Sequence, residues 1–284
     1  MKKPIVGGFY ADPESRVYNG KAYIYVTRSL PYEEQLNLDV VVSEDLEGFD
    51  TVTDILDIPT YNGIWGAVWA PSVIEAGGRY YIVFAANDIH ENGEAGGLYV
   101  GVCDTPDGKF KNVRDDGGPI LNTFYNGAQP IDAHFYKDTD GEIYLYYGGW
   151  GHLNVCRMAH GMDGIITDTL KEITPANYVE APFVMRGESK YILMYSSGSW
   201  TNGTYCVKTA TADTPMGPFL GEDTVLSASE LADGPGHNSG FEFGGKTYIA
   251  YHRRVIGDKN CHHRVLCIDE MNVCGDRIEK IIMT

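Results

Sequence analysis

One strand pattern recurs five times along the chain and constrains the fold more than any other feature. Each copy is a short apolar strand that contains a tyrosine and follows a tight polar turn; the anchor residues are Tyr23, Tyr81, Tyr144, Tyr191 and Tyr248. Consecutive anchors lie 58, 63, 47 and 57 residues apart, which suits a blade of about four strands with its loops. We therefore predict an all-β fold, a five-bladed β-propeller, in which residues 1–284 form a single domain.

Two other architectures fit this pattern less well. A tandem solenoid does not bring one position of every repeat to a common axis, and a β-sandwich does not repeat five times at this length. A propeller must also close its ring, because an open ring leaves exposed sheet edges. We expect Met1–Val6 to pair near the C-terminal strands and so close it.

One position in each repeat carries chemically important residues. Counting back eleven residues from the anchor tyrosine, or twelve in the third copy, gives Asp12, Ala70, Asp132, Glu180 and His237. If the copies surround one axis, these positions converge, and three carboxylates in one place cannot all ionise freely. Hydrolysis of glycosides uses such a set, with one carboxyl protonated as an acid and another ionised as a base. The alternative is that Asp12 and Glu180 only cap the ends of blades, but the recurrence at one repeat position favours catalysis.

Aromatic residues near these positions are candidates for contact with a sugar ring. Trp69 directly precedes Ala70, where an indole beside a carboxylate cluster is able to stack on a sugar. A tryptophan that simply fills the core fits the sequence equally well. Tyr10, Trp65 and Trp200 are weaker candidates for the same role.

Three further residues each have a functional and a structural interpretation. His134 shares a strand face with Asp132 by alternation, so we expect it to orient that carboxylate. His237 is either a hydrogen-bonded core histidine or the residue that holds a cation or a water cluster at the centre of the acidic ring. Arg264 either counters the carboxylates and binds a sugar hydroxyl, or forms a salt bridge on an outer strand.

The composition argues against several partners and sites. The chain has 39 acidic and 22 basic residues, a formal net charge of −17, whereas nucleic acids and anionic membranes need a basic face. The six cysteines form no C-x-x-C pair, and no H-E-x-x-H pattern indicates catalytic zinc. The N-terminus has no hydrophobic stretch typical of a signal peptide, so we expect a cytoplasmic protein.

Five ordered motifs resemble glycoside hydrolase family 43, and the resemblance covers nearly the whole chain. They are Ala11-Asp12-Pro13, Trp69-Ala70-Pro71-Ser72, Ile131-Asp132-Ala133-His134-Phe135, Glu180-Ala181-Pro182-Phe183 and Gly236-His237-Asn238-Ser239. The resemblance implies a catalytic five-bladed propeller with a funnel-like active site on its axis and an inverting mechanism. It implies that Asp12 is the general base, Glu180 the general acid, and Asp132 the residue that tunes and orients that acid.

The same resemblance implies roles for other residues and a substrate class. Arg264 is expected to reach the sugar and Trp69 to form the wall of the subsite. His237 matches the family's central histidine, often associated with calcium through water, so a structural calcium ion on the axis is implied and no cofactor is required. Many members of the family have His where this chain has Tyr10, so the resemblance does not decide which sugar the enzyme recognises.

We therefore expect an exo-acting glycosidase that releases terminal α-L-arabinofuranose or β-D-xylose from plant cell-wall oligosaccharides. An exo-galactanase of the same family is one alternative, although galactanases of this type typically lack the base that Asp12 supplies. A carbohydrate-binding propeller without catalysis is another. A retaining fructosidase-type propeller fits less well, because the opening is Ala11-Asp12-Pro13-Glu14 instead of Asn-Asp-Pro-Asn-Gly.

Overall fold

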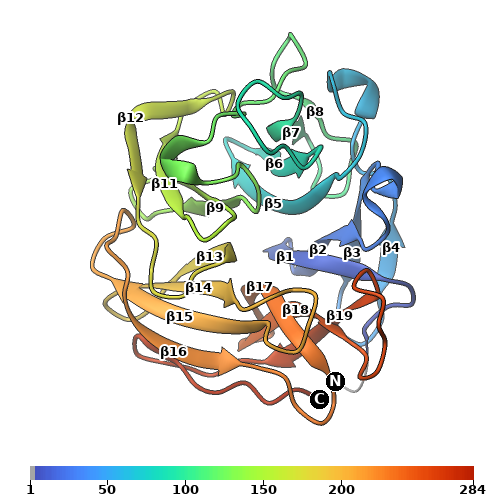
Figure 1. The fold of residues 1–284 in the computed structure, drawn as a ribbon, viewed down its shortest axis with the longest axis vertical. Helices are drawn as coiled ribbons and strands as arrows, with labels where there is room; N and C mark the ends of the chain where they lie inside the picture. Colours follow the sequence, from blue (N-terminus) through green and yellow to red (C-terminus); the bar gives the residue numbers. More distant parts are fainter. Residues whose placement is uncertain (1–3) are drawn as a thin grey trace.

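The computed structural model describes residues 4–284 and contains five antiparallel sheets that follow one another around a central axis (Figure 1). The first two sheets contain β1 (Tyr10–Tyr18), β2 (Lys21–Arg28), β3 (Leu38–Ser43) and β4 (Asp50–Val52), then β5 (Trp69–Ala76), β6 (Arg79–Ala86), β7 (Gly97–Cys103) and β8 (Lys111–Asn112). The next two contain β9 (His134–Lys137), β10 (Ile143–Tyr147), β11 (Asn154–Met158) and β12 (Ile165–Glu172), then β13 (Glu180–Arg186), β14 (Tyr191–Ser197), β15 (Cys206–Ala212) and β16 (Leu220–Leu226).

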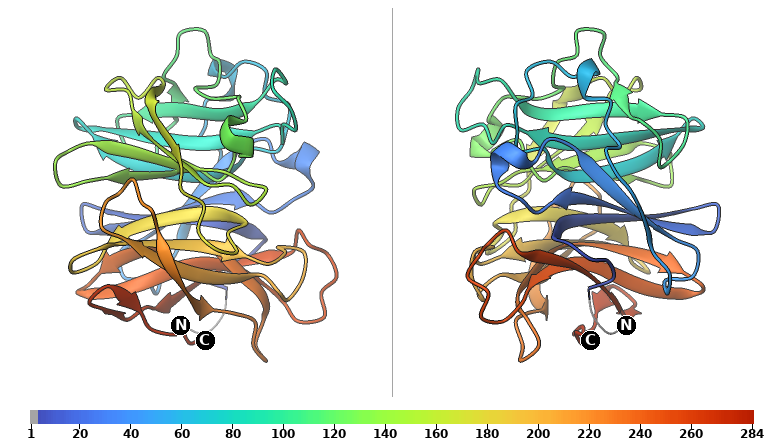
Figure 2. Two further views of the ribbon diagram at one scale, coloured as in Figure 1. Left: turned by 60° about the vertical axis from the view of Figure 1, so that its left-hand side comes forward. Right: turned by 90° about the vertical axis from the view of Figure 1, so that its right-hand side faces the viewer.

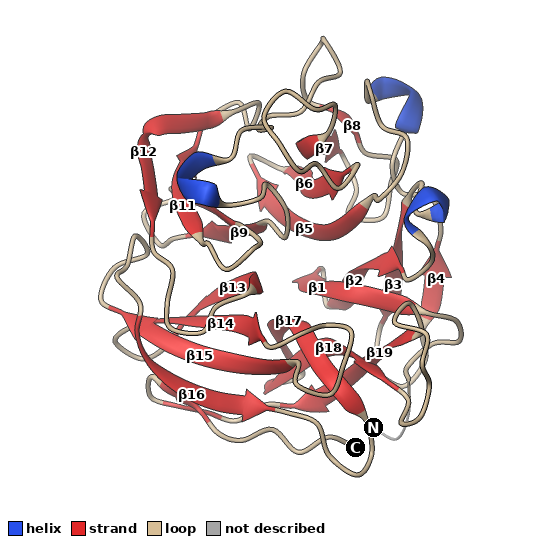
Figure 3. Cartoon of the chain, viewed as in Figure 1, coloured by secondary structure: helices blue, strands red, loops and turns tan. Residues whose placement is uncertain are grey.

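The fifth sheet contains β17 (Asp233–Phe243), β18 (Lys246–Arg254) and β19 (Arg264–Glu270), and a separate pair consists of β20 (Val273–Cys274) and β21 (Arg277–Ile278). The helices of the described chain are three short 3-10 turns, η1 (Tyr32–Glu34), η2 (Ile58–Thr60) and η3 (Tyr125–Gly127) (Figure 3). None of them is long and apolar enough to span a bilayer.

The first strand of each sheet lies nearest the axis. The strands β1, β5, β9, β13 and β17 each contact the next one in this order, and β17 contacts β1. The sheets therefore form a closed ring, and the chain is an all-β five-bladed β-propeller, as its repeats predicted.

The hydrophobic core is divided into five layers, one between each pair of neighbouring sheets. Between the first two sheets, for example, Tyr25 and Val40 pack with Val73 and Phe84. Each sheet is thus buried on both of its faces, which explains why the second strand of every repeat is nearly continuously apolar.

A repeated turn is explained by contacts between neighbouring blades. The hydroxyl of Tyr25 in the first blade donates a hydrogen bond to the carbonyl of Pro106 in the second, at 2.7 Å. The hydroxyl of Tyr146 in the third blade binds the carbonyl of Pro215 in the fourth in the same way, at 2.6 Å. The Asp-Thr-Pro turns of the second and fourth blades are therefore acceptors for buried tyrosines, which need a partner in the core.

The described N-terminal residues pair with a C-terminal strand and close the ring, as expected from the sequence. The backbone N–H of Ile5 donates to the carbonyl of Leu266 in β19 at 2.9 Å, and the side chains of Ile5 and Val6 pack against the cluster between the fifth and first sheets. The first described residues and the C-terminal end of the chain lie at the same end of the molecule in both views of Figure 2. Met1–Lys3 lie outside the described residues.

The inner strands start with an irregularity that aims side chains at the axis. β1, β5, β13 and β17 each contain a register shift near their start, and a residue with positive φ lies within it: Asp12 (53°), Ala70 (50°), Ala181 (59°) and His237 (43°). Asp132, with φ of 52°, occupies the corresponding place just before β9. Such bulges commonly redirect side chains next to active sites.

The strand pairing shows that Glu180 does not occupy the repeat position of Asp12, contrary to the count from the sequence. In β13 the residue that corresponds to Asp12 is Ala181, because Met185 pairs with Ile192 as Arg16 pairs with Tyr23. The anchor of the fourth repeat is therefore Ile192, and Tyr191 precedes it by one residue. Glu180 consequently lies one residue before the equivalent position, at the place that Trp69 occupies in the second blade.

Candidate active site

The starts of the inner strands and the adjoining loops enclose a cavity of about 260 Å³ on the axis. Its lining includes seven of the residues proposed from the sequence: Asp12, Trp69, Asp132, Glu180, Trp200, His237 and Arg264. The other lining residues are Tyr32, Asp88, His90, Gln129, Ile131 and Trp150. The three predicted carboxyl groups thus meet in one pocket, although the copies do not supply them from one repeat position.

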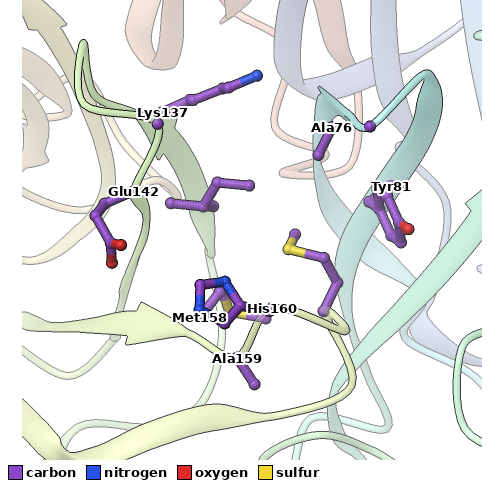
Figure 4. A pocket seen from close by; sticks show the side chains of 11 residues that line it. Ala76, Tyr81, Lys137, Glu142, Met158, Ala159 and His160 are labelled. Atoms are coloured by element: carbon purple, nitrogen blue, oxygen red, sulfur yellow. The ribbon is translucent and has the colours of Figure 1, made fainter.

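A second hollow, of about 290 Å³, lies between the second and third blades and contains none of these residues (Figure 4). It is lined by Ala76 at the far end of β5, and by Lys137, Glu142 and His160 of the third blade. Because Trp69 begins β5 and Ala76 ends it, the two hollows are at opposite ends of that strand. The axial cavity is therefore the candidate active site.

Asp12 is surrounded by nitrogen atoms. Its Oδ1 lies 3.1 Å from Nη1 of Arg264, 3.2 Å from Nδ1 of His237 and 3.4 Å from Nδ1 of His252. Burial alone raises the pKa of Asp12, but the charges of Arg264 and His237 outweigh it and hold that pKa well below its usual value. Asp12 is therefore ionised throughout the neutral range.

Asp132 and Glu180 have the opposite electrostatic character. Burial is the main cause that raises the pKa of each carboxyl group, and the charge of Glu180 raises that of Asp132 further. The hydroxyl of Tyr205 donates to Oε1 of Glu180 at 2.8 Å and partly offsets the effect of burial on Glu180. Asp132 and Glu180 therefore each keep a proton to a higher pH than Asp12 does.

His237 separates two of the carboxylates. Its Nδ1 lies 3.2 Å from Asp12 and 3.7 Å from Oδ2 of Asp132, and its backbone N–H donates to Oγ of Ser196. Burial lowers the pKa of His237, but the two aspartates outweigh it and raise that pKa to about 9. The imidazole is thus protonated at neutral pH and serves as a counter-charge.

This arrangement does not fit a metal ion bound directly by His237. Calcium prefers six to eight oxygen ligands, so a calcium ion at this place would be held through water, as the resemblance implied, and not by the ring nitrogen. Within residues 4–284, no group of three or more His, Cys, Asp or Glu side chains is arranged to hold a metal ion.

Arg264 and Trp69 lie in the cavity as the resemblance implied. Nε of Arg264 donates to Oγ of Ser29 at 2.9 Å, and its guanidinium group lies 5.3 Å above the ring of Trp200. The ring of Trp69 meets that of Tyr32 edge-on, with the centroids 4.9 Å apart. The wall around the carboxyl groups is therefore aromatic on two sides, as sugar-binding sites commonly are.

Three predicted site residues lie outside this cavity, and one of them, Trp65, is largely exposed. The hydroxyl of Tyr10 donates to Oδ2 of Asp39 at 3.2 Å, within the first blade, so Tyr10 is not a platform for a sugar. Nδ1 of His134 lies 3.5 Å from Glu14, so His134 does not orient Asp132. The alternation of strand faces does not apply to these two residues. Asp132 has a left-handed backbone and lies before β9 starts, so its side chain does not share a face with that of His134.

Two residues that sequence reasoning missed support the acid and the base. His252 in β18 accepts a hydrogen bond at Nδ1 from the backbone N–H of Asp12, at 3.2 Å, and burial lowers its pKa to about 4. Its ring stacks on Tyr205, with centroids 5.8 Å apart and planes 9° apart. The only sequence signal was Gly236, which faces His252 across the sheet; a Cβ atom there would lie 2.1 Å from the ring of Tyr205.

Comparison with known proteins decides the family. The profile described as Glycosyl hydrolases family 43 matches residues 1–276. This chain belongs to glycoside hydrolase family 43. It is 37% identical to the β-D-galactofuranosidase xynD of Aspergillus niger, over 94% of this chain and 81% of that protein. It is 26% identical to a β-xylosidase of Xylanibacter ruminicola, over 93% of each.

Solved structures of this family share the fold. A thermostable family-43 glycoside hydrolase superposes with a TM-score of 0.82 at 23% identity, over 98% of this chain and 95% of that one. CoXyl43, a β-xylosidase/α-arabinofuranosidase from a compost microbial metagenome, was solved with xylotriose in a calcium-free form. It also gives a TM-score of 0.82 at 23% identity, over 99% of this chain and 96% of that one. The chain is thus a glycosidase with the family's propeller.

Proposed function

We propose that this glycosidase releases single sugars from the ends of oligosaccharides with inversion at the anomeric carbon. Asp12 acts as the general base, Glu180 as the general acid, and Asp132 shares the acid's proton and holds it in place. The enzyme needs no cofactor for this chemistry.

The observation that carries the proposal is the opposite protonation of carboxyl groups in one cavity. Arg264 and His237 hold the pKa of Asp12 down, whereas burial raises the pKa of Asp132 and of Glu180. An inverting glycosidase needs such a pair: an acid that protonates the leaving oxygen and a base that activates water. A carbohydrate-binding propeller without catalysis has no use for this difference in pKa.

The proposed reaction has one chemical step. Glu180 gives its proton to the glycosidic oxygen as the bond from that oxygen to C1 breaks. A water molecule on the opposite face of the sugar attacks C1 and loses a proton to Asp12. The products are the free sugar of inverted configuration and the shortened alcohol, and return of the proton from Asp12 to Glu180 through solvent restores the enzyme.

The size of the cavity supports removal of one terminal sugar at a time. At about 260 Å³ it is smaller than the roughly 300–1,000 Å³ pockets that hold drug-sized ligands. One sugar fits between the carboxyl groups and the aromatic wall, and the remainder of the substrate extends toward solvent.

For the sugar itself, we propose α-L-arabinofuranose or β-D-xylose, the substrates expected from the sequence. Several relatives have names that support this choice, including a xylosidase/arabinosidase of Bacteroides ovatus that is 24% identical. The second candidate is β-D-galactofuranose, because the 37% identical relative is named a β-D-galactofuranosidase. The furanose ring of β-D-galactofuranose has the same stereochemistry as that of α-L-arabinofuranose, so one pocket is able to bind both rings.

Hydrolysis of a panel of 4-nitrophenyl glycosides tests the proposal. The panel contains α-L-arabinofuranoside, β-D-xyloside, β-D-galactofuranoside and β-D-galactopyranoside, each measured with wild type and with Asp12→Asn. We expect turnover of at least one of the first three and a loss of roughly 10²–10⁴-fold in Asp12→Asn. Turnover of the galactopyranoside alone, or an Asp12→Asn variant of undiminished activity, would refute the proposal.

A further inference from the structure

A side hollow borders the catalytic cavity at a carboxylate that has no role in the proposed acid–base chemistry. This hollow has a volume of about 400 Å³ and is lined in part by Trp65, Glu94 and Ala95. Tyr32, Asp88 and His90 line both the hollow and the catalytic cavity. Asp88 is therefore part of the wall that the two spaces share.

The backbone holds Asp88 in a conformation that few residues adopt. Asn87 and Asp88 follow β6 with φ of 73° and 47°, in the left-handed region, which Asn and Asp adopt more readily than other residues with a Cβ atom. The side chain of Asn87, 4% exposed, secures this turn. Its Oδ1 accepts from the N–H of Trp65 at 2.9 Å, and its Nδ2 donates to the carbonyl of Ala95 at 2.9 Å. The hydrogen-bonded turn thus sets the position of the Asp88 side chain at the wall of the cavity.

The carboxylate of Asp88 is fixed but keeps free acceptor sites. Its Oδ1 accepts a hydrogen bond from Nε2 of Gln129 at 2.9 Å, and Gln129 is only 2% exposed. Its Oδ2 lies 3.6 Å from Nε2 of His90, and no lysine or arginine in residues 4–284 forms an ion pair with it. The Asp88 side chain is 23% exposed. A carboxylate has about four acceptor sites, so a ligand with adjacent hydroxyl groups would satisfy those that Gln129 leaves open.

We propose that Asp88 binds the exocyclic hydroxyl groups of a hexofuranosyl residue whose ring occupies the catalytic cavity. The exocyclic carbon chain then lies in the side hollow, and the enzyme hydrolyses β-D-galactofuranosides in addition to the α-L-arabinofuranosides proposed above. This inference rests on the proposed function, since it uses the same cavity and the same acid.

The orientation of the furanose ring in the cavity follows from the positions of Glu180 and Asp88. Glu180 begins β13 in the fourth blade, whereas Asp88 follows β6 in the second, and the third blade lies between them (Figure 1). The acid must lie next to the leaving oxygen on C1. In a furanose, C4 and its exocyclic substituent lie across the ring oxygen from C1, and so extend away from Glu180 toward Asp88.

The two furanosides differ only at this substituent. Arabinofuranose carries one exocyclic carbon with one hydroxyl group on C4, whereas galactofuranose carries two carbons and two hydroxyl groups. A pocket without the side hollow would have no room for the second carbon. Asp88 and the hollow are thus the features of this chain that distinguish the two sugars.

The test compares 4-nitrophenyl β-D-galactofuranoside with 4-nitrophenyl α-L-arabinofuranoside in wild type, Asp88→Ala and Asp88→Asn. A hydrogen bond to a charged group contributes about 1.5–3 kcal/mol, or roughly 10–150-fold in binding. We expect Asp88→Ala to lower kcat/KM for the galactofuranoside by that factor, mainly through KM, and to change the arabinofuranoside less than about threefold. Asp88→Asn keeps the acceptor for Gln129 and is expected to show a smaller loss with the same selectivity.

Glu91→Gln is the matched control, because Glu91 lies on the same loop and lines neither space. It should leave both substrates unchanged, and a thermal unfolding curve identifies any variant that has not folded. If Asp88→Ala does not fold, Asp88→Asn decides the question. Equal losses on both furanosides, or no loss on either, would overturn the inference while leaving the proposed function intact. A wild type that hydrolyses no glycoside of the panel would overturn both.

Discussion

The hydrogen bond from Tyr205 to Glu180 allows a quantitative test of how the acid is tuned. The change Tyr205→Phe removes only the hydroxyl group that lies 2.8 Å from Oε1 of Glu180. This hydrogen bond favours the ionised carboxylate and lowers the pKa of Glu180, against the larger effect of burial, which raises it. Its removal must therefore raise the pKa of Glu180.

The magnitude follows from the surroundings of the bond. Tyr205 is fully buried, so solvent does not replace the lost donor. A hydrogen bond to a charged group contributes about 1.5–3 kcal/mol, and one pKa unit corresponds to about 1.4 kcal/mol. We expect the basic limb of the pH profile of kcat/KM to move up by about 1–2 pH units. Since a weaker acid transfers its proton more slowly, kcat on an oligosaccharide should fall by roughly tenfold.

The assay is the pH dependence of kcat/KM for wild type, Tyr205→Phe and Tyr195→Phe. Tyr195 is a matched control, because its hydroxyl donates a hydrogen bond of the same length, 2.8 Å, to the carbonyl of Ala176 and does not contact Glu180. Tyr195→Phe should leave the basic limb in place. A folded Tyr205→Phe variant whose basic limb stays in place or moves down would refute the reasoning.

Three other variants probe the acid, the base and the close packing beside them. Glu180→Gln should lose roughly 10²–10⁴-fold on an oligosaccharide and recover much of it on a dinitrophenyl glycoside, which needs little protonation; equal losses on both substrates would contradict its role as the acid. Arg264→Met removes the charge that lowers the pKa of Asp12, so the acidic limb of the pH profile should move to higher pH, and an unchanged limb would show that Arg264 does not tune the base. Gly236→Ala places a Cβ atom 2.1 Å from the Tyr205 ring and should cost about 1–3 kcal/mol of stability, measured by denaturant unfolding, together with activity; wild-type stability would contradict the packing described.

The ring was predictable because each blade must bury two faces of its sheet. That requirement imposes an apolar, tyrosine-containing strand at a nearly constant interval, and the interval is visible in the sequence. The turn at Pro106 and Pro215 repeats for a related reason, since both carbonyls accept hydrogen bonds from buried tyrosines of the preceding blade.

The register of the fourth blade was not predictable from the same interval. Tyr191 looked like the anchor, but Ile192 takes that position in the strand pairing. The carboxyl group of Glu180 reaches the cavity all the same, from the neighbouring position that Trp69 uses in the second blade. The inference of a shared pocket was confirmed, and its detailed basis in the fourth repeat was wrong.

The remaining differences arise where local patterns do not determine the position of a side chain. The left-handed conformation of Asp132 interrupts strand alternation, so His134 contacts Glu14 and not the catalytic carboxyl groups. Tyr205 precedes β15 and Asp88 follows β6. Only the folded ring brings Tyr205 to Glu180 and Asp88 to the wall of the cavity. A glycine such as Gly236 indicates that another group packs closely against the backbone, but the sequence does not show that this group is the side chain of Tyr205.

The anomeric configuration of the first product tests the central claim most directly. Hydrolysis of an α-L-arabinofuranoside, or of the furanoside that the enzyme prefers, is followed by proton NMR at times shorter than the mutarotation of the released sugar. If Asp12 activates water on the face opposite to the oxygen that Glu180 protonates, the first sugar to appear is the β-L anomer, or for a galactofuranoside the α-D anomer. Initial release of the anomer that matches the substrate would contradict the account.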